Sequence, residues 1–293
     1  MFDFLKRARS PIQIVRLNDV YHSYRGAITG RNVAPAKKLG KAGGKLFVLS
    51  FRGDVMATQA SALSEEITAV LSGANPATDE VMIRVESPGG AVHAYGYASS
   101  QINRLKAAKI PVTICVDKIA ASGGYMMACL GDQILAAPYA VLGSIGVVAE
   151  FMNFNSLLKQ MGISYQQYTA GKYKRTVGPL GPITEEGETK FNNDLQRVHV
   201  LFKEHVQRFR ADVNIDDIAT GEHWYGIDAK EKGLVDHIAT SEDYILHAIS
   251  QREVLSVRYA PPRNFGDRIR LSLAKLCTDV FLEITGVYMR MRI

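Results

Sequence analysis

The sequence predicts an α/β fold in which mainly parallel strands form a sheet that is covered by helices. Three short apolar runs, LFVLSF (46–51), VMIRV (81–85) and VTICV (112–116), show no alternation with polar residues. This pattern is typical of strands that are buried on both faces. A helical stripe of apolar residues follows each run, and such strand–helix alternation favours a parallel sheet with crossover helices.

The remaining elements follow from periodicity. The stripe from Leu63 to Leu71 predicts a helix for which Ser61 or Ser64 is available as N-cap. No internal repeat is visible, so one folded domain is the simplest organisation. Further helices are expected through residue 105, directly after residue 122, over 153–161 and along 191–209, and further strands over 133–137, 143–148 and 163–168.

Charge separates the two ends of the chain from its body. Residues 1–45 hold ten Lys/Arg against two acidic residues, and residues 252–293 hold eight against four, so the middle is net acidic. We predict a basic N-terminal arm or linker (1–44), a single folded domain (45–253) and a basic amphipathic tail (254–293). Basic ends on an acidic body suit an anionic membrane surface, whereas a nucleic-acid-binding domain carries its positive charge on the folded surface.

Neither a membrane-spanning helix nor a signal peptide is expected. No stretch reaches about twenty apolar residues, and the start MFDFLKRARS becomes charged after five residues. The three cysteines are widely spaced and form no CxxC or Cys/His cluster, so we expect no structural zinc, no disulfide framework and no metal or organic cofactor. The stretch from residue 265 on could lie on a membrane, pack against another subunit or dock on its own domain.

Two glycine-rich turns carry the first sign of chemistry. SPGG (87–90) follows one predicted strand and ASGG (121–124) follows the next. Where a parallel strand gives way to a helix, backbone N–H groups are left without partners and point into the crevice at the strand ends. The N–H of Gly123, together with one from the first turn, would polarise a carbonyl beside the Ser122 hydroxyl, as acyl transfer requires. The same pattern also occurs in ordinary tight turns.

A nucleophilic serine needs a base. None of the seven histidines lies in a recognisable triad context, and only His93, just after the first turn, is a rival candidate. His199 and His205 are expected to be solvated or to lie at the edge of the core. A lysine can act instead if burial lowers the pKa of its amine from about 10.4 by several units. Lys172 and Lys174 are available, although a Lys-Tyr-Lys-Arg run is by itself typical of a solvated loop.

Several motifs together resemble the signal peptide peptidase A family, and most closely its short bacterial branch, the SohB-type serine proteases. The similarity extends over about residues 45–253 and implies the fold of the Clp protease and crotonase superfamily. AKEKGLVD (229–236) is also similar to that superfamily. The motifs are ESPGG (86–90), DKIAASGGYMMA (117–128), GSIGVV (143–148), TAGKYKRT (169–176) and ATGEHWYG (219–226).

The resemblance implies a serine endopeptidase that works through an acyl-enzyme intermediate. Ser122 would be the nucleophile and Lys174 the general base. Ser144 would orient the lysine amine, and Gly90 and Gly123 would supply the oxyanion N–H groups. Remnant signal peptides or small unfolded polypeptides would be the substrates.

The resemblance also implies a homo-oligomeric ring in which neighbouring subunits supply the serine and the lysine, so we expect an isolated monomer to be inactive. SohB-type proteins commonly begin with a membrane-spanning helix, which this sequence lacks. We therefore expect a bacterial protein that is either cytoplasmic or associated with the inner membrane through its basic ends, and the periplasmic face stays open.

Two alternatives use the same fold. A crotonase-type acyl-CoA enzyme would need carboxylates for proton transfer opposite the oxyanion site, and Glu86 and Asp117 lie near the turns. A non-catalytic scaffold would have lost the chemistry. The joint presence of Ser122, Lys174 and Ser144 argues against the scaffold.

Overall fold

The computed structural model describes residues 10–30 and 44–261. Residues 14–258 form one compact unit, and residues 1–13 with 259–293 form a second, most of which lies outside the described residues. The strands are β1 (Ile12–Arg16), β2 (Lys45–Arg52), β3 (Glu80–Glu86), β4 (Val112–Val116), β5 (Ile119–Ala121), β6 (Gln133–Ala136), β7 (Val141–Gly143), β8 (His223–Tyr225), β9 (His237–Ile238) and β10 (Glu253–Tyr259). The helices are α1 (Leu17–Thr29), α2 (Ala60–Leu71), α3 (Val92–Ala107), α4 (Gly123–Ala128), α5 (Asn155–Gln160), α6 (Glu185–Phe209), α7 (Ile215–Ile218), α8 (Gly226–Glu231) and α9 (Ser241–Ile249).

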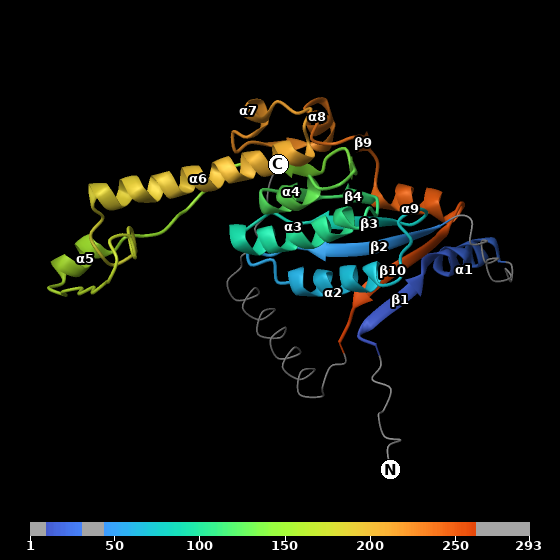
Figure 1. The fold of residues 1–293 in the computed structure, drawn as a ribbon, viewed down its shortest axis with the longest axis horizontal. Helices are drawn as coiled ribbons and strands as arrows, with labels where there is room; N and C mark the ends of the chain where they lie inside the picture. The colour runs from blue at the N-terminus through green and yellow to red at the C-terminus, as the bar shows by residue number, and fades with distance from the viewer. Residues whose placement is uncertain (1–9, 31–43, 262–293) are drawn as a thin grey trace, which may run out of the picture. The chain divides into compact units, whose positions relative to one another are not determined.

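A seven-stranded sheet in the order β1-β10-β2-β3-β4-β6-β9 forms the centre of the fold (Figure 1). From β10 to β9, every neighbouring pair of strands is parallel. A smaller sheet joins β5 to β7 in parallel and β7 to β8 antiparallel. The predicted α/β fold with a mainly parallel sheet and covering helices is confirmed.

Both faces of the central sheet are buried, which explains the uninterrupted apolar runs. Alternate side chains of a strand point to opposite faces. Leu46 and Val48 of β2 pack in a cluster with Ile245 of α9, and α1 contributes partly buried side chains to that cluster. Phe51, at an odd-numbered position of the same strand, faces the other layer, where its ring packs against Tyr95 of α3. Full burial of each such side chain contributes about 1.5–3 kcal/mol to folding.

The segment after β7 differs from the predicted strand over 143–148, which is wrong beyond Gly143. Ser144 adopts a φ of 51°, outside the strand region. Its N–H donates to the carbonyl of Glu222 at 2.6 Å. This turn directs the chain away from the smaller sheet.

Two other local expectations are also wrong. No strand forms over 163–168, where Tyr168 is 89% exposed and therefore has no core to pack against. The N-cap of α2 is Gln59, and both Ser61 and Ser64 lie inside the helix.

Both ends of the described chain belong to the sheet. Residues 12–29, which were expected within a basic arm, form β1 and α1. The reason is the buried Asn18, whose amide donates to the carbonyls of Ile249 and Arg252 and accepts the N–H of Val254. β10 also carries the sheet beyond the predicted boundary at residue 253. Half of the predicted N-terminal arm (residues 1–9 and 31–43) and the tail from residue 262 on lie outside the described residues.

Within the described ranges, no helix has both the length and the apolar character needed to cross a membrane.

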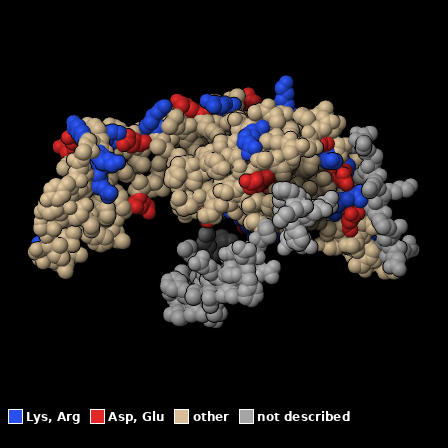
Figure 2. Space-filling view, turned by 60° about the horizontal axis from the view of Figure 1, so that its bottom comes forward, with Lys and Arg blue, Asp and Glu red and all other residues tan. Residues whose placement is uncertain are grey.

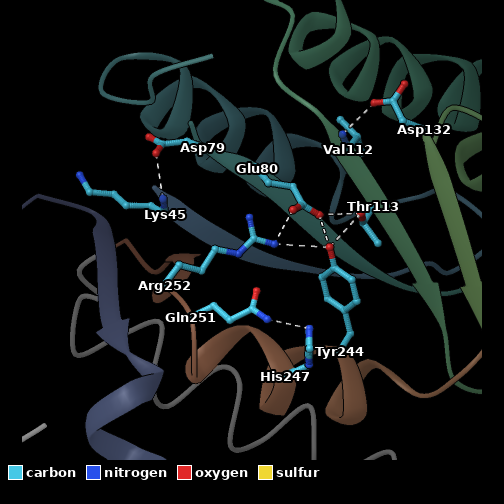
Figure 3. Close-up of polar contacts among 10 residues, drawn as sticks. All are labelled: Lys45, Asp79, Glu80, Val112, Thr113, Asp132, Tyr244, His247, Gln251 and Arg252. Carbon is cyan, nitrogen blue, oxygen red and sulfur yellow. Dashed lines mark hydrogen bonds and ion pairs between the residues drawn. The ribbon is translucent and has the colours of Figure 1, made fainter. Parts of the chain in front are cut away.

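A buried polar cluster ties the last strand to the centre of the sheet (Figure 3). Glu80, at the start of β3, accepts hydrogen bonds from Thr113 at 2.6 Å and from the Tyr244 hydroxyl, and it pairs with Arg252 at 2.5 Å. The Glu80 and Arg252 side chains are only 14% and 19% exposed. Burial, with the nearby Glu80 carboxylate, raises the pKa of Tyr244 to about 12, so the phenol stays a donor. The cluster therefore joins α9 and β10 to strands that are distant in sequence.

We expect Arg252→Met to lower the free energy of unfolding by about 3 kcal/mol, because the Glu80 carboxylate would stay buried without its cation. Lys118→Met is the matched control. It breaks a 3.2 Å pair with Glu86 whose partners are 68% and 38% exposed, and it should cost less than about 1 kcal/mol. Urea unfolding followed by the single tryptophan, Trp224, measures both at one protein concentration. Equal losses would contradict the role given to the cluster.

Candidate active site at the carboxyl end of the strands

Ser122 lies at a sharp junction between a strand and a helix. β5 ends at Ala121, and α4 begins at Gly123. Ser122 adopts φ 51° and ψ −119°, a strained conformation for a residue with a side chain. Its N–H donates to the carbonyl of Gly143 at 2.8 Å, and its carbonyl accepts the N–H of Met126 at 2.9 Å. The junction thus holds a partly exposed hydroxyl at the N-terminus of α4.

The turn after β3 packs directly against this junction. Ser87 forms an isolated parallel bridge with Ala120, which lays the two glycine turns side by side. A Cβ on Gly89, whose φ is +94°, would lie 2.7 Å from the Cβ of Ser122 and 2.8 Å from the N of Gly123. A Cβ on Gly90 would lie 2.2 Å from a backbone oxygen. Glycine is therefore required at both positions for this close approach.

Two backbone N–H groups beside Ser122 have no acceptor among the residues that the structure describes. Gly123 is the first residue of α4, so its N–H has no intrahelical acceptor. The N–H of Gly90 makes no hydrogen bond to the described residues, whereas that of Gly89 donates to the Ser87 hydroxyl at 3.1 Å. Of the two glycines in the first turn, only Gly90 therefore has an N–H that is unpaired within the described part of the chain. Such a pair of donors suits a developing oxyanion.

Ser144 directly follows the neighbouring strand β7, at the same end of the smaller sheet as Ser122. β5 and β7 are parallel, with Ala121 opposite Gly143, so Ser122 and Ser144 are each the first residue beyond paired strand ends. Ser144 is partly exposed and also has a φ of 51°. Trp224 packs under the preceding glycine, where a Cβ would lie 2.6 Å from its ring. The structure therefore brings these two hydroxyl-bearing residues to one edge.

The two candidate lysines lie elsewhere and differ in environment. Lys172 forms a 2.5 Å ion pair with Glu186 at the start of α6, and the Tyr173 hydroxyl donates to the same carboxylate at 3.3 Å. The hydrogen bond to Glu186 raises the pKa of Lys172, which keeps its amine protonated and unsuited to accept a proton. Lys174 is exposed, and its amine has no hydrogen bond or ion pair within the described chain. The geometry therefore favours Lys174 over Lys172 as a base.

Within one chain, α6 separates the lysines from Ser122. The far end of this helix packs on the site through His205, whose Nε2 meets the carbonyl of Met126 at 2.9 Å. Glu186, which holds Lys172, is nineteen residues away from His205, or about 28 Å along a helix. Figure 1 shows α5 beside the opposite end of α6 from α4. The dry environment expected for the Lys174 amine is thus absent from the single chain.

The histidines do not form a triad with Ser122. His93 is exposed in the first turn of α3 and makes no hydrogen bond to the described residues. His199 meets the carbonyl of Ile145 at 3.2 Å, as His205 meets that of Met126. Burial lowers the pKa of His205, so its ring is neutral near pH 7. Both helix histidines are core-edge residues, as predicted.

The carboxylates that a crotonase-type reaction would use are already engaged. Glu86 pairs with Arg52 at 3.4 Å and with Lys118 at 3.2 Å. Asp117 accepts hydrogen bonds from the N–H and the hydroxyl of Ser241 at 2.8 and 2.6 Å. Neither is free for proton transfer. The described residues also contain no group of three or more potential metal ligands.

Comparison with known proteins identifies the family. The sequence model of peptidase family S49 matches residues 104–255, and that of the S49 N-terminal region matches residues 30–102. The chain belongs to peptidase family S49. The first of these S49 models covers Ser122, Ser144 and Lys174, and the second covers the SPGG turn.

Several S49 relatives carry protease names. The chain is 51% identical to the probable protease SohB of Haemophilus influenzae over 214 residues, which are 73% of this chain and 60% of that protein. It is 45% identical to the probable protease SohB of Buchnera aphidicola subsp. Acyrthosiphon pisum over 240 residues, 82% of this chain and 71% of the relative. The predicted SohB-type membership is confirmed. The matched regions thus span between about three fifths and seven tenths of these relatives.

Sequence reasoning missed the buried hydrogen bonds beneath the glycine turns. The Ser87 hydroxyl lies 2.5 Å from the Tyr95 hydroxyl, and both residues are fully buried. Ser87 belongs to the quoted ESPGG motif, but only its glycines were considered. Nothing in the spacing of Tyr95 pointed to the site.

We expect Gly89→Ala to lower peptide hydrolysis at least about 100-fold, the scale of losing an oxyanion donor, because the new methyl would displace Ser122 and the Gly123 N–H. Gly96→Ala is the control, since a Cβ there meets nothing within 4 Å and Gly96 lies inside α3. Cleavage of fluorescent casein and thermal unfolding are measured for both. Parental turnover by Gly89→Ala would contradict the packing argument.

Proposed function

We propose that this chain is a serine endopeptidase in which Ser122 is the nucleophile and Lys174 is the general base. The observation that carries the proposal is the strained junction at Ser122, which packs against the SPGG turn and lies next to two N–H groups, of Gly90 and Gly123, that have no acceptor among the described residues. Membership of a peptidase family supports the same chemistry.

The proposed reaction has two stages. The neutral amine of Lys174 takes the proton of the Ser122 hydroxyl while its oxygen attacks the peptide carbonyl carbon. The N–H groups of Gly90 and Gly123 hold the resulting oxyanion. The tetrahedral intermediate then expels the amine, which receives the proton from Lys174, and leaves an acyl ester on Ser122. Water, deprotonated by Lys174, attacks this ester and releases the acid and the serine hydroxyl.

Ser144 completes the proposed machinery by orienting the amine of Lys174. Its place beyond β7, level with Ser122, would put its hydroxyl next to a lysine that approaches the nucleophile. A hydroxyl can accept a hydrogen bond from a neutral amine without favouring the charged form as a carboxylate would.

The lysine of each site comes, in this proposal, from a neighbouring subunit of a homo-oligomeric ring. The separation along α6 supports this arrangement, because Glu186 at the start of the helix holds the lysine loop through Lys172, whereas His205 near its end contacts α4. A neighbour that covers Lys174 would also supply the burial that lowers its pKa.

The segment that carries Lys174 has the surface expected of a subunit contact. The segment 148–184 contacts α6 through Phe151, whose ring packs edge to face with that of Phe191 at a centroid distance of 6.2 Å. In Figure 2, the end of the molecule that carries α5 is mostly uncharged. Clustered exposed apolar side chains of this kind mark interaction sites. They are Phe151, Met152, Phe154, Leu157, Met161 and Ile163.

The proposed substrates are remnant signal peptides or small unfolded polypeptides. The Ser122 junction lies at the surface ends of β3 and β5, where an extended chain can approach the turns. The basic ends of the chain would bring the ring to an anionic membrane surface. Nucleic acid is not a proposed partner, and on the face drawn in Figure 2 basic and acidic side chains are interspersed.

Ser122→Ala and Lys174→Met should each reduce hydrolysis of casein by at least about 10³-fold, because each removes a group needed in the bond-breaking step. Lys172→Met, the control within the same loop, should keep most of the activity, since that amine is held by Glu186. Mass spectrometry of the released peptides, with the Ser122→Ala protein as blank, measures turnover and cleavage sites. Near-parental activity of Lys174→Met would contradict the assignment of Lys174 as the general base.

Mixing the two inactive variants tests the shared site. If neighbours supply the serine and the lysine, rings reassembled from equal amounts of Ser122→Ala and Lys174→Met should regain about a quarter of the parental activity, because a random mixture restores one site in four. The activity should elute with the oligomer in size-exclusion chromatography. Full activity in a monomer fraction of the parent protein would refute the ring.

A further inference from the structure

A chain of four hydrogen-bonding groups runs beneath the glycine turns, and its direction is determined. The N–H of Gly89 donates to the Ser87 oxygen at 3.1 Å. The Tyr95 hydroxyl donates its one proton to the carbonyl of Asp54 at 2.8 Å. The 2.5 Å contact between the two hydroxyls must therefore use the proton of Ser87, with the Tyr95 oxygen as acceptor. The chain thus links the loop after β2, through α3, to the turn after β3.

The ring of Tyr95 supports the second turn directly. A Cβ on Gly123 would lie 2.4 Å from Cγ of Tyr95 and within 2.8 Å of both neighbouring ring carbons. The backbone of the α4 N-terminus therefore rests on the face of this ring. The rings of Tyr95 and Phe51 of β2 pack edge to face with their centroids 6.3 Å apart, which restricts the orientation of the Tyr95 ring. Tyr95 is completely buried, so it has little freedom to move.

One side chain therefore determines the placement of both free N–H groups. The hydroxyl of Tyr95 holds Ser87, and Ser87 holds Gly89, which immediately precedes the Gly90 donor. The ring of Tyr95 holds Gly123, the other donor. The loop after β2 joins the same arrangement, because the N–H of Ala91 donates to the carbonyl of Val55 at 2.8 Å. Misplacing an oxyanion donor by a fraction of an ångström weakens its hydrogen bond in the transition state.

We propose that Tyr95, acting through the Ser87 hydroxyl and through its ring, is the positioning residue of the oxyanion donors. This inference rests on the proposed function. Tyr95 does not touch the substrate, and its role is to keep the N–H groups of Gly90 and Gly123 aimed at one point beside Ser122. This role predicts that loss of the Tyr95 hydroxyl lowers kcat more than it weakens the binding of substrate.

Tyr95→Phe tests the inference, because it keeps the ring and removes the link to Ser87. We expect kcat to fall about ten- to a hundred-fold, which is a smaller decrease than the removal of a whole oxyanion donor causes. KM should stay within about twofold of the parental value. The rate is measured on a quenched fluorescent peptide chosen from the casein fragments that the parent releases. The measured rate is divided by the concentration of active sites, which is determined by complete labelling with a fluorophosphonate. Misfolded protein, which does not react with the label, is thereby excluded from kcat.

Two further readouts separate positioning from a general structural effect. Affinity for a peptide aldehyde, whose adduct with Ser122 places an oxyanion between the donors, should fall in parallel with kcat/KM. The pH profile of kcat should keep its shape, since Tyr95 does not transfer a proton in the reaction. Tyr97→Phe is the matched control, because Tyr97 lies on the same helix with 48% exposure and should change none of these values.

Ser87→Ala gives the second arm of the test. If Tyr95 acts through Ser87, the variant carrying both Tyr95→Phe and Ser87→Ala should lose no more kcat than Ser87→Ala alone. Additive losses, or parental kcat in Tyr95→Phe, would overturn the inference. A Ser122→Ala protein with parental turnover would instead overturn the proposed function. The two failures are therefore distinguishable.

Discussion

The parallel bridge between Ser87 and Ala120 presses the turn after β3 against the junction after β5, and the geometry of the candidate site depends on this contact. It brings Gly89 so close to Ser122 that no side chain fits between them. At this contact the backbone is strained, and the N–H groups of Gly90 and Gly123 have no acceptor in residues 10–30 and 44–261. Unpaired N–H groups and a positive φ both cost free energy, and the buried hydrogen bonds of Ser87 and Tyr95 stabilise the arrangement from below.

The second constraint is the length of α6. Its far end is buried against α4 through Phe202 and Val206, whereas its first turns carry the lysine loop. A straight helix of this length keeps the two ends apart, so a complete site in our proposal requires a second subunit. The same geometry would make activity depend on assembly, because an unassembled chain would hold a nucleophile without a base.

Charge distinguishes residues that the sequence alone presents as equivalent. Lys172 and Lys174 stand two positions apart in one motif, yet Glu186 binds the first and leaves the second free. In the same way, Glu86 and Asp117 are paired with neighbouring side chains and are therefore not available as general acids or bases. Pairing, rather than residue type, thus decides which titratable groups remain available for chemistry.

The sequence by itself determined the middle strands of the sheet, β2, β3, β4 and β6, because apolar runs buried on both faces and helical stripes are local patterns with few alternative folds. Its motifs also led to Ser122 and to the glycine turns, since strand, turn and helix follow one another along the chain there. The irregular course after Gly143, the exposed stretch around Tyr168 and the inclusion of residues 12–29 in the fold were not predictable, because each depends on partners distant in sequence, such as Glu222 for Ser144 and Val254 for Asn18. The tertiary structure alone decided which glycine keeps a free N–H and how Tyr95 supports it. It also decided that α6 holds Lys174 far from Ser122 of the same chain, because these relations arise only when separate elements pack together.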